Sequence, residues 1–105
     1  MRYVLNSPVL TSFGTYSFTG PIDIERARRF VESGAQSAVG HASTARFLTR
    51  LLGVEIRCER CAITMHPGDA ALVFRLNERP GAGSELQFDD LDRSSYQLGL
   101  LTRIE

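Results

Sequence analysis

The sequence predicts an α/β fold in which helices pack on a small mixed β-sheet. Three observations favour this class: several short runs rich in β-branched and aromatic residues, two longer segments with helical apolar periodicity, and glycine or proline between them. The 105 residues are expected to form one domain, spanning 1–105. The core of such a chain is small, which favours stabilisation by a partner subunit.

The N-terminal part of the chain predicts two strands. Residues 2–6 are apolar enough for a buried strand, and the Ser-Pro pair that follows ends it and begins a loop. Residues 14–19 predict a short second strand, with Tyr16 and Phe18 on one of its faces. We therefore expect two strands before the first helix.

Two amphipathic helices, separated by a short strand, are expected next. Asp23 is a favoured cap for a helix that reaches about Ser33, because its carboxylate accepts from unpaired backbone N–H groups. Residues 36–39 predict a third strand. A second helix is expected over 41–52, with an apolar face toward the sheet and Gly53 at its end.

The second half of the chain predicts further strands with turns between them. The expected elements are a strand over 62–65, a turn over 66–69, a central strand over 71–76, a loop over 80–84, a short helical piece over 88–93 and a final strand over 96–104. Strands mixed with two good helices favour a sheet covered by helices.

Charge and hydropathy exclude several functional classes. The chain carries 12 basic and 12 acidic residues, and this balance argues against a protein that coats long nucleic acids. Every basic residue is an arginine, so Schiff-base and P-loop lysines are excluded. No apolar segment approaches 18 residues and no signal peptide is visible, so we expect a cytoplasmic protein without a membrane partner.

The first candidate site lies at the start of the second helix. A helix start offers unpaired N–H groups and partial positive charge, which together favour a phosphate. His41 can pass a proton to or from a group bound there, and Ser43 and Thr44 add hydroxyl donors in the same turn. The helix start disfavours imidazolium and a phosphate favours it, so an acid and a base role both remain open. The alternative is an incidental helix-terminal histidine bonded to backbone.

Two further candidate sites follow strands. Asn6 and Ser7 leave the first strand at an edge where α/β sheets usually place ligands; the alternative is a plain Ser-Pro turn. Arg75 and Arg79 flank the end of the expected central strand, where a guanidinium can clamp a phosphate with two parallel hydrogen bonds. The alternative is a pair of solvated surface arginines.

The two cysteines form a lone CxxC. Cys58 and Cys61 do not make a disulfide scaffold, and a structural zinc needs four ligands, whereas only His66 lies near them in sequence. A zinc shared across a dimer is one alternative, a redox role is another, and two unremarkable thiols are the third. We expect no metal and no cofactor. The segment 81–83 lacks the third glycine and the lysine of a nucleotide-binding loop.

Several blocks of the sequence resemble the viral type III anti-CRISPR ring nuclease family. The Gly-His-x-Ser-Thr block at 40–44 and the Gly-Asp-x-Ala-Leu-Val block at 68–73 are fairly specific in combination. The similar segments follow the family's order through nearly the whole chain: 3–10, 13–18, 37–45, 67–76 with Arg79, and 96–101.

The resemblance implies a homodimer whose cleft at the two-fold interface binds cyclic tetra-adenylate, the second messenger of type III CRISPR defence. Members cut this ring without metal, through attack by a ribose 2′-hydroxyl, and leave linear adenylates with a 2′,3′-cyclic phosphate. His41 matches the histidine thought to protonate the departing 5′-oxygen. Arg79 matches a phosphate-binding arginine, and Asn6 falls in a ligand-contacting loop.

One departure from the family pattern keeps alternatives open. Some members carry a catalytic glutamate shortly after the arginine, but here 80–83 holds no carboxylate, and Glu78 or Glu85 would have to substitute. The first alternative is a binding protein that sequesters the cyclic oligoadenylate without cutting it. The second is a small regulatory protein in which His41 is structural.

Overall fold

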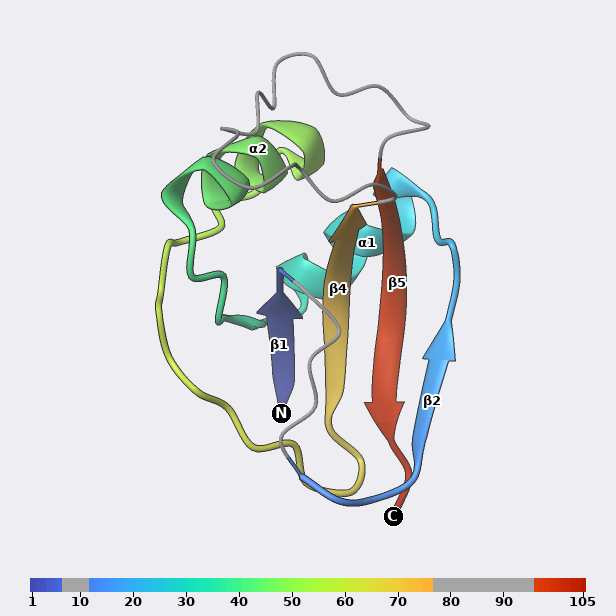
Figure 1. Cartoon of the computed structure of the whole chain (residues 1–105). Helices are drawn as coiled ribbons and strands as arrows, with labels where there is room; N and C mark the ends of the chain where they lie inside the picture. The colour runs from blue at the N-terminus through green and yellow to red at the C-terminus, as the bar shows by residue number, and fades with distance from the viewer. Residues whose placement is uncertain (7–11, 77–95) are drawn as a thin grey trace.

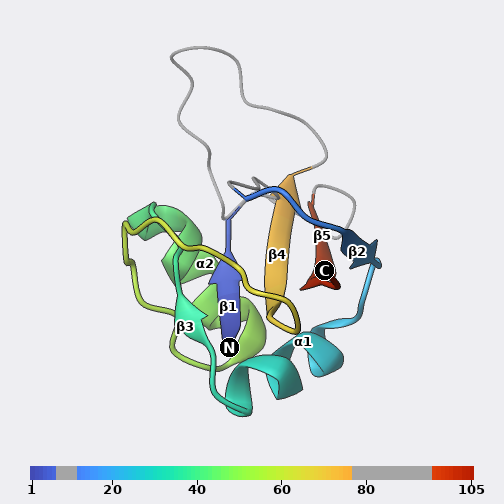
Figure 2. The ribbon, with the colours of Figure 1, turned by 90° about the horizontal axis from the view of Figure 1, so that it is seen from below.

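The computed structural model describes residues 1–6, 12–76 and 96–105 (Figure 1). In these residues the elements are β1 (Arg2–Leu5), β2 (Tyr16–Thr19), α1 (Ile24–Glu32), β3 (Gln36–Ser37), α2 (Ala42–Leu52), β4 (Ala70–Leu76) and β5 (Tyr96–Arg103). The strands form one sheet in the order β2-β5-β4-β1-β3, which Figure 2 shows side by side. β1 is parallel to β3 and β4, whereas β5 is antiparallel to β4 and β2. The predicted mixed α/β sheet is confirmed.

β4 is the central strand, as its apolar run predicts. It pairs with β1 on one side and along its whole length with β5 on the other. Leu72 and Val73 are fully buried, and they point to opposite faces because side chains alternate along a strand. A strand that is buried on both faces reads as a continuous apolar run, which is why this one could be identified without alternation.

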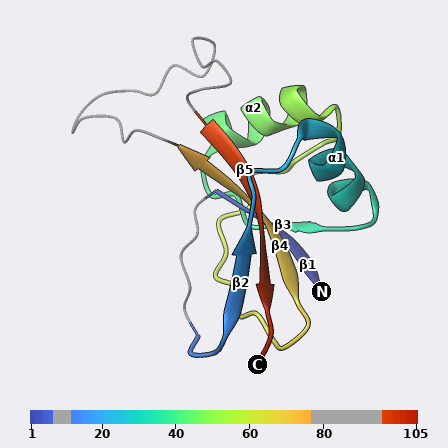
Figure 3. The same cartoon turned by 90° about the vertical axis from the view of Figure 1, so that its right-hand side faces the viewer.

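Both helices cover the same face of the sheet (Figure 3). The carboxylate of Asp23 caps α1 and accepts a hydrogen bond from the backbone N–H of Arg26 at 2.7 Å. Ala27 and Val31 of α1 are buried against the sheet. The helix-side core also contains Val4, Leu48, Leu52, Leu72, Phe74 and Leu98. The amphipathic pattern therefore placed both helices correctly.

Three aromatic rings fix α2 over the ends of β4 and β5. Phe47 of α2 lies 5.7 Å from Phe74 and 5.3 Å from Tyr96, measured between ring centroids, and the two strand rings are 5.9 Å apart. Tilted and offset pairs at these separations contribute about 0.5–1.5 kcal/mol each beyond the area they bury. The aromatic contacts thus anchor α2 at Phe47, near the helix start where His41 lies.

The opposite face of the sheet is covered by an extended segment instead of a helix. Ile63 and Met65 pack there on a second core that includes Tyr3, Leu5, Ala71, Val73 and Leu101. The prediction of a strand over 62–65 is wrong, since the segment has no strand assignment. β1 and β4 already have neighbours on both sides, so the segment crosses the sheet face, and its alternating apolar residues reflect contact with that face.

The third strand is shorter than the sequence predicts. β3 pairs with β1 only through Gln36 and Ser37, and the N–H of Ala38 still donates to the carbonyl of Val4 at 2.9 Å. β1 ends at Leu5, so Val39 has no partner there and forms an isolated parallel bridge with Cys58 instead. The expected loop over 80–84 and helical piece over 88–93 lie outside the described residues.

The remaining turns agree with expectation. Gly53 ends α2 in the left-handed conformation, at φ 70°, and donates its N–H to the carbonyl of Thr49. The turn at 66–69 places Gly68 at φ 93° and is closed by the N–H of Asp69 donating to the carbonyl of His66. In the part of the chain described here, no helix is long and apolar enough to cross a membrane.

Candidate functional site

The candidate residues lie at the same end of the sheet because three strands run parallel. The carboxyl ends of β1, β3 and β4 lie at the same end of the sheet, and so do the residues that finish or follow these strands. Asn6 follows β1, Arg75 is near the end of β4, and His41 comes shortly after β3. Ser7 and Arg79 lie outside the described residues.

His41 is the N-cap of α2. Its backbone is extended, at φ −122° and ψ 126°, and its carbonyl accepts the N–H of Ala45 at 3.0 Å. Its side chain makes no capping hydrogen bond and is exposed to solvent. A serine or aspartate at this position would turn its oxygen back onto the helix N–H groups, whereas the imidazole of His41 is available to a ligand.

The two hydroxyls of the first turn differ in access. Ser43 is half-buried, whereas Thr44 is buried at 6% exposure. The backbone N–H groups of the first turn of a helix have no intrahelical partner and carry the positive end of the helix dipole. An anion at this helix start would therefore meet Ser43 and the backbone before it could reach the Thr44 hydroxyl.

An arginine that sequence reasoning missed stands beside this helix start. The segment after α2 returns alongside the chain that leads to His41, with the N–H of Glu59 donating to the carbonyl of Val39 at 2.9 Å. A Cβ on Gly40 would lie 3.5 Å from Cγ of Arg60, so the exposed Arg60 side chain passes next to the residue before His41. The pairing joins residues 20 positions apart, and only the glycine at 40 hints at a close approach.

The charges around His41 favour an anion. Arg60 adds a full positive charge to the partial charge of the helix start. Glu59 is exposed and offsets part of this field. A local positive charge in a chain of zero net charge suits a compact anionic ligand better than a long polyanion.

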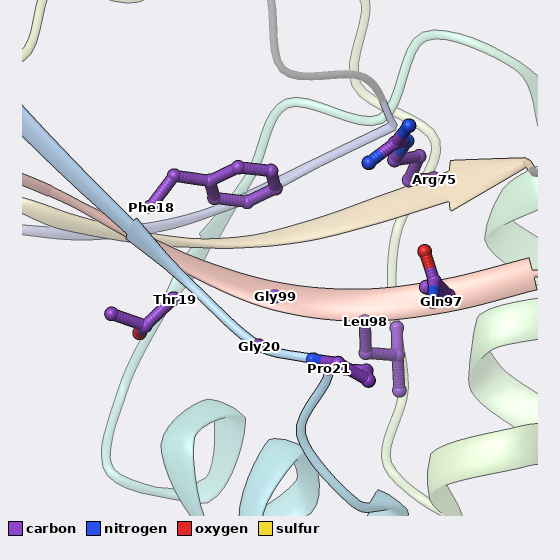
Figure 4. Close-up of a pocket in the computed structure, with 8 residues that line it drawn as sticks. All are labelled: Phe18, Thr19, Gly20, Pro21, Arg75, Gln97, Leu98 and Gly99. Atoms are coloured by element: carbon purple, nitrogen blue, oxygen red, sulfur yellow. The ribbon is translucent and has the colours of Figure 1, made fainter.

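Arg75 opens onto the face of the sheet opposite the helices. Its neighbour Phe74 packs below α2, and alternation along β4 sends Arg75 the other way. Arg75 is exposed, stands level with Gln97 of β5 and lines a cavity of about 290 Å³ (Figure 4). The structure therefore places Arg75 and His41 at one end of the sheet, but Arg75 reaches a separate hollow.

The cysteines and His66 do not form a metal site in the residues described. Cys58 and Cys61 are free and exposed, and no group of three or more potential metal-ligating side chains gathers within the described ranges. His66 lies in the turn before β4, at the opposite end of that strand from Arg75. The lone CxxC thus has no further ligand among these residues.

Asp69 has a structural role at that opposite end. Its carboxylate accepts hydrogen bonds from the α-ammonium of Met1 at 2.6 Å and from the backbone N–H of His66 at 2.8 Å. The Met1 ammonium, followed by the His66 hydrogen bond, lowers the pKa of Asp69 below its ordinary value. The Gly-Asp pair of the 68–73 block therefore ties the start of β1 to the turn before β4.

Comparisons with known proteins find a matching family and relatives in a bacterium and a virus. Residues 2–98 match the family described as STIV B116-like. The chain is 35% identical over 104 residues to the uncharacterized protein YddF of Bacillus subtilis (strain 168), covering 96% of this chain and 95% of the relative. It is 31% identical over 105 residues to uncharacterized protein 26 of Sulfolobus islandicus filamentous virus (isolate Iceland/Hveragerdi), covering 95% and 89%.

A solved structure has the same architecture. B116 of Sulfolobus turreted icosahedral virus superposes with a TM-score of 0.73 at 22% identity, covering 97% of this chain and 98% of that one. At this identity the likeness concerns the fold alone.

Proposed function

The chain belongs to the STIV B116-like family, and we propose that it is a metal-independent ring nuclease that cleaves cyclic tetra-adenylate. The observation that carries the proposal is the exposed imidazole of His41 at the start of α2, with its side chain not used to cap the helix. The sequence blocks that resemble the anti-CRISPR ring nucleases include this residue. Arg60, beside Gly40, supports the proposal because it adds a cation where a phosphate would lie.

The reaction needs little from the protein beyond alignment, a proton donor and charge stabilisation. The ribose 2′-oxygen attacks the adjacent phosphorus and loses its proton to water, which closes a 2′,3′-cyclic phosphate. The bond from phosphorus to the 5′-oxygen breaks, and its electron pair stays on that oxygen. His41 in its imidazolium form gives the 5′-oxygen a proton. The helix start and Arg60 stabilise the charge that develops on the phosphate.

A homodimer would match the ligand's symmetry. Two protomers related by a two-fold axis present two copies of His41 to a ring of four phosphates. Both the dimer and a ligand cleft at its two-fold interface are part of the proposal. The interface between the two protomers would also add buried surface to the small core that the chain length predicts.

The test is cleavage of labelled cyclic tetra-adenylate by the purified protein with EDTA present. We expect linear adenylates with a cyclic phosphate end. His41→Ala should abolish cutting and largely keep binding, because the charges that hold the phosphate remain. His66→Ala is the matched control, since His66 is exposed at the other end of β4 and should leave the rate unchanged.

The other outcomes select the alternatives. Tight binding of intact ring by the unaltered protein would indicate sequestration, in line with the missing carboxylate over 80–83. Absence of any interaction would favour a regulatory protein with a structural His41. Unchanged turnover in His41→Ala would refute the acid role even if the ring is cut.

A further inference from the structure

A second feature of the molecule is the hollow that Arg75 enters. Three side chains rise from three neighbouring strands on the same side of the sheet: Phe18 from β2, Gln97 from β5 and Arg75 from β4 (Figure 4). All three are exposed. Gly99 lies between them on β5 and leaves the floor of the hollow without a side chain. An aromatic ring, an amide and a guanidinium thus border one cavity of about 290 Å³.

The ring of Phe18 lies on Gly99. A Cβ on Gly99 would come within 2.7 Å of Cε1 of Phe18, so the glycine permits this close contact. The ring is still 46% exposed and is absent from both hydrophobic cores of the described residues. An aromatic residue with one covered side and one solvated side is a platform on which a flat ligand can stack.

The polar groups beside the ring suit a purine nucleotide. The amide of Gln97 has both donors and an acceptor, and this combination pairs with the N6 and N7 edge of adenine. Arg75 stands level with Gln97 on the neighbouring strand and has only donors, so it suits a phosphate. The volume lies at the lower end of ligand pockets, which fits one nucleotide unit better than a whole ring.

We propose that this hollow is a purine-base subsite, with Phe18 stacking on the base, Gln97 reading its edge and Arg75 holding an attached phosphate. The identification of the base as one adenine of cyclic tetra-adenylate rests on the proposed function. The subsite itself rests on the three side chains and the glycine floor. It gives the protein a means of recognising the base, which the phosphate contacts near His41 do not provide.

The test measures binding by titration calorimetry with two pairs of probes. The first pair is 5′-AMP and ribose 5-phosphate, which differ by the base; the second is the 2′-deoxy form of cyclic tetra-adenylate and that of cyclic tetra-uridylate, which lack the attacking hydroxyl and are not cut. We expect the unaltered protein to prefer the adenine member of each pair. Phe18→Leu should weaken binding of both adenine probes about ten-fold, and Gln97→Ala should reduce the preference for adenine over uracil.

Two matched controls keep the result specific. Phe13→Leu removes an aromatic side chain that is 100% exposed and does not line the hollow. Gln36→Ala removes an exposed amide on β3, at the far side of the sheet. Both should bind all four probes as the unaltered protein does. Sedimentation of each variant checks that its oligomeric state is unchanged.

The outcomes separate this inference from the proposed function. If the protein cuts the ring but Phe18→Leu binds both adenine probes normally, the subsite is refuted and the ring nuclease stands. If the ring is not cut, the 5′-AMP arm still decides the subsite, and equal affinity for 5′-AMP and ribose 5-phosphate would overturn it. A weaker dimer in Phe18→Leu with unchanged binding of 5′-AMP would show a subunit contact instead and would also overturn it.

Discussion

Replacing Gly99 with alanine tests the close packing of Phe18 directly. The new methyl carbon would stand 2.7 Å from Cε1 and 3.1 Å from Cζ of Phe18, and 3.1 Å from the carbonyl oxygen of Thr19. Carbon atoms in contact lie about 3.5–4.0 Å apart, so the ring must withdraw by about 1 Å. Overpacking of this kind costs about 1–3 kcal/mol. Alanine also restricts the backbone of the unfolded chain more than glycine does, and this stabilises the folded state by about 0.4–1 kcal/mol.

The expected net loss is therefore about 1–2 kcal/mol in the free energy of unfolding, which in a domain of this size lowers Tm by roughly 5–15 °C. Thermal unfolding followed by circular dichroism measures it. Gly40→Ala is the matched control, because its nearest atom would be Cγ of Arg60 at an ordinary 3.5 Å. That variant should stay within about 0.5 kcal/mol of the unaltered protein.

A double-mutant cycle isolates the ring contact. Phe18→Ala removes the atoms that the new methyl group would strike, so Gly99→Ala should cost about 1 kcal/mol less in that background. The contact with the Thr19 carbonyl stays in both backgrounds and cancels in the cycle. An equal loss of Tm with and without the Phe18 ring would refute the placement of the ring on Gly99, and with it the platform on which the base subsite depends.

Two further predictions concern the helix start and the N-terminus. Arg60→Ala should weaken binding of cyclic tetra-adenylate about ten-fold through loss of a charge-assisted hydrogen bond. The control is Arg57→Ala, which removes an exposed arginine paired with Glu55 on the same segment and should leave binding unchanged. Equal binding by the two variants would remove Arg60 from the site. Asp69 contributes stability above its ordinary carboxyl pKa of 3.8, and this contribution disappears as the pH falls through the lower pKa of the folded state. Tm measured against pH should therefore show a gap between Asp69→Asn and the unaltered protein at pH 6 that closes on acidification, and a constant gap would contradict the ion pair with Met1.

The sequence predicts correctly those elements that depend only on residues close to them in the chain. Asp23 caps its helix and Gly53 ends the second one, because caps depend on backbone groups a few residues away. The strand over 62–65 was wrong because alternation records contact with an apolar face and not the presence of a neighbouring strand. The shortened third strand has a similar cause, since its length depends on where β1 ends.

The same distinction applies to the candidate site. His41 could be identified from sequence because a helix start is a local feature. Arg60 could not, because its position follows from the pairing of 58–59 with Val39. Phe18 was predicted to share a face with Tyr16, but its role depends on Gly99, which is 81 residues away and reaches it only through the register of β2 with β5.

The end of β4 connects the two parts of the proposed mechanism. Phe74 packs against Phe47 and so holds α2, whose first turn carries His41. Arg75, the next residue, points to the opposite face and borders the hollow with Gln97. Because adjacent residues of one hydrogen-bonded strand cannot shift independently, the helix that carries the proposed acid and the proposed phosphate contact of the base subsite are both tied to β4. In the proposed mechanism, a ligand that engaged both would be aligned by this strand, and base recognition would then help to place the scissile phosphate.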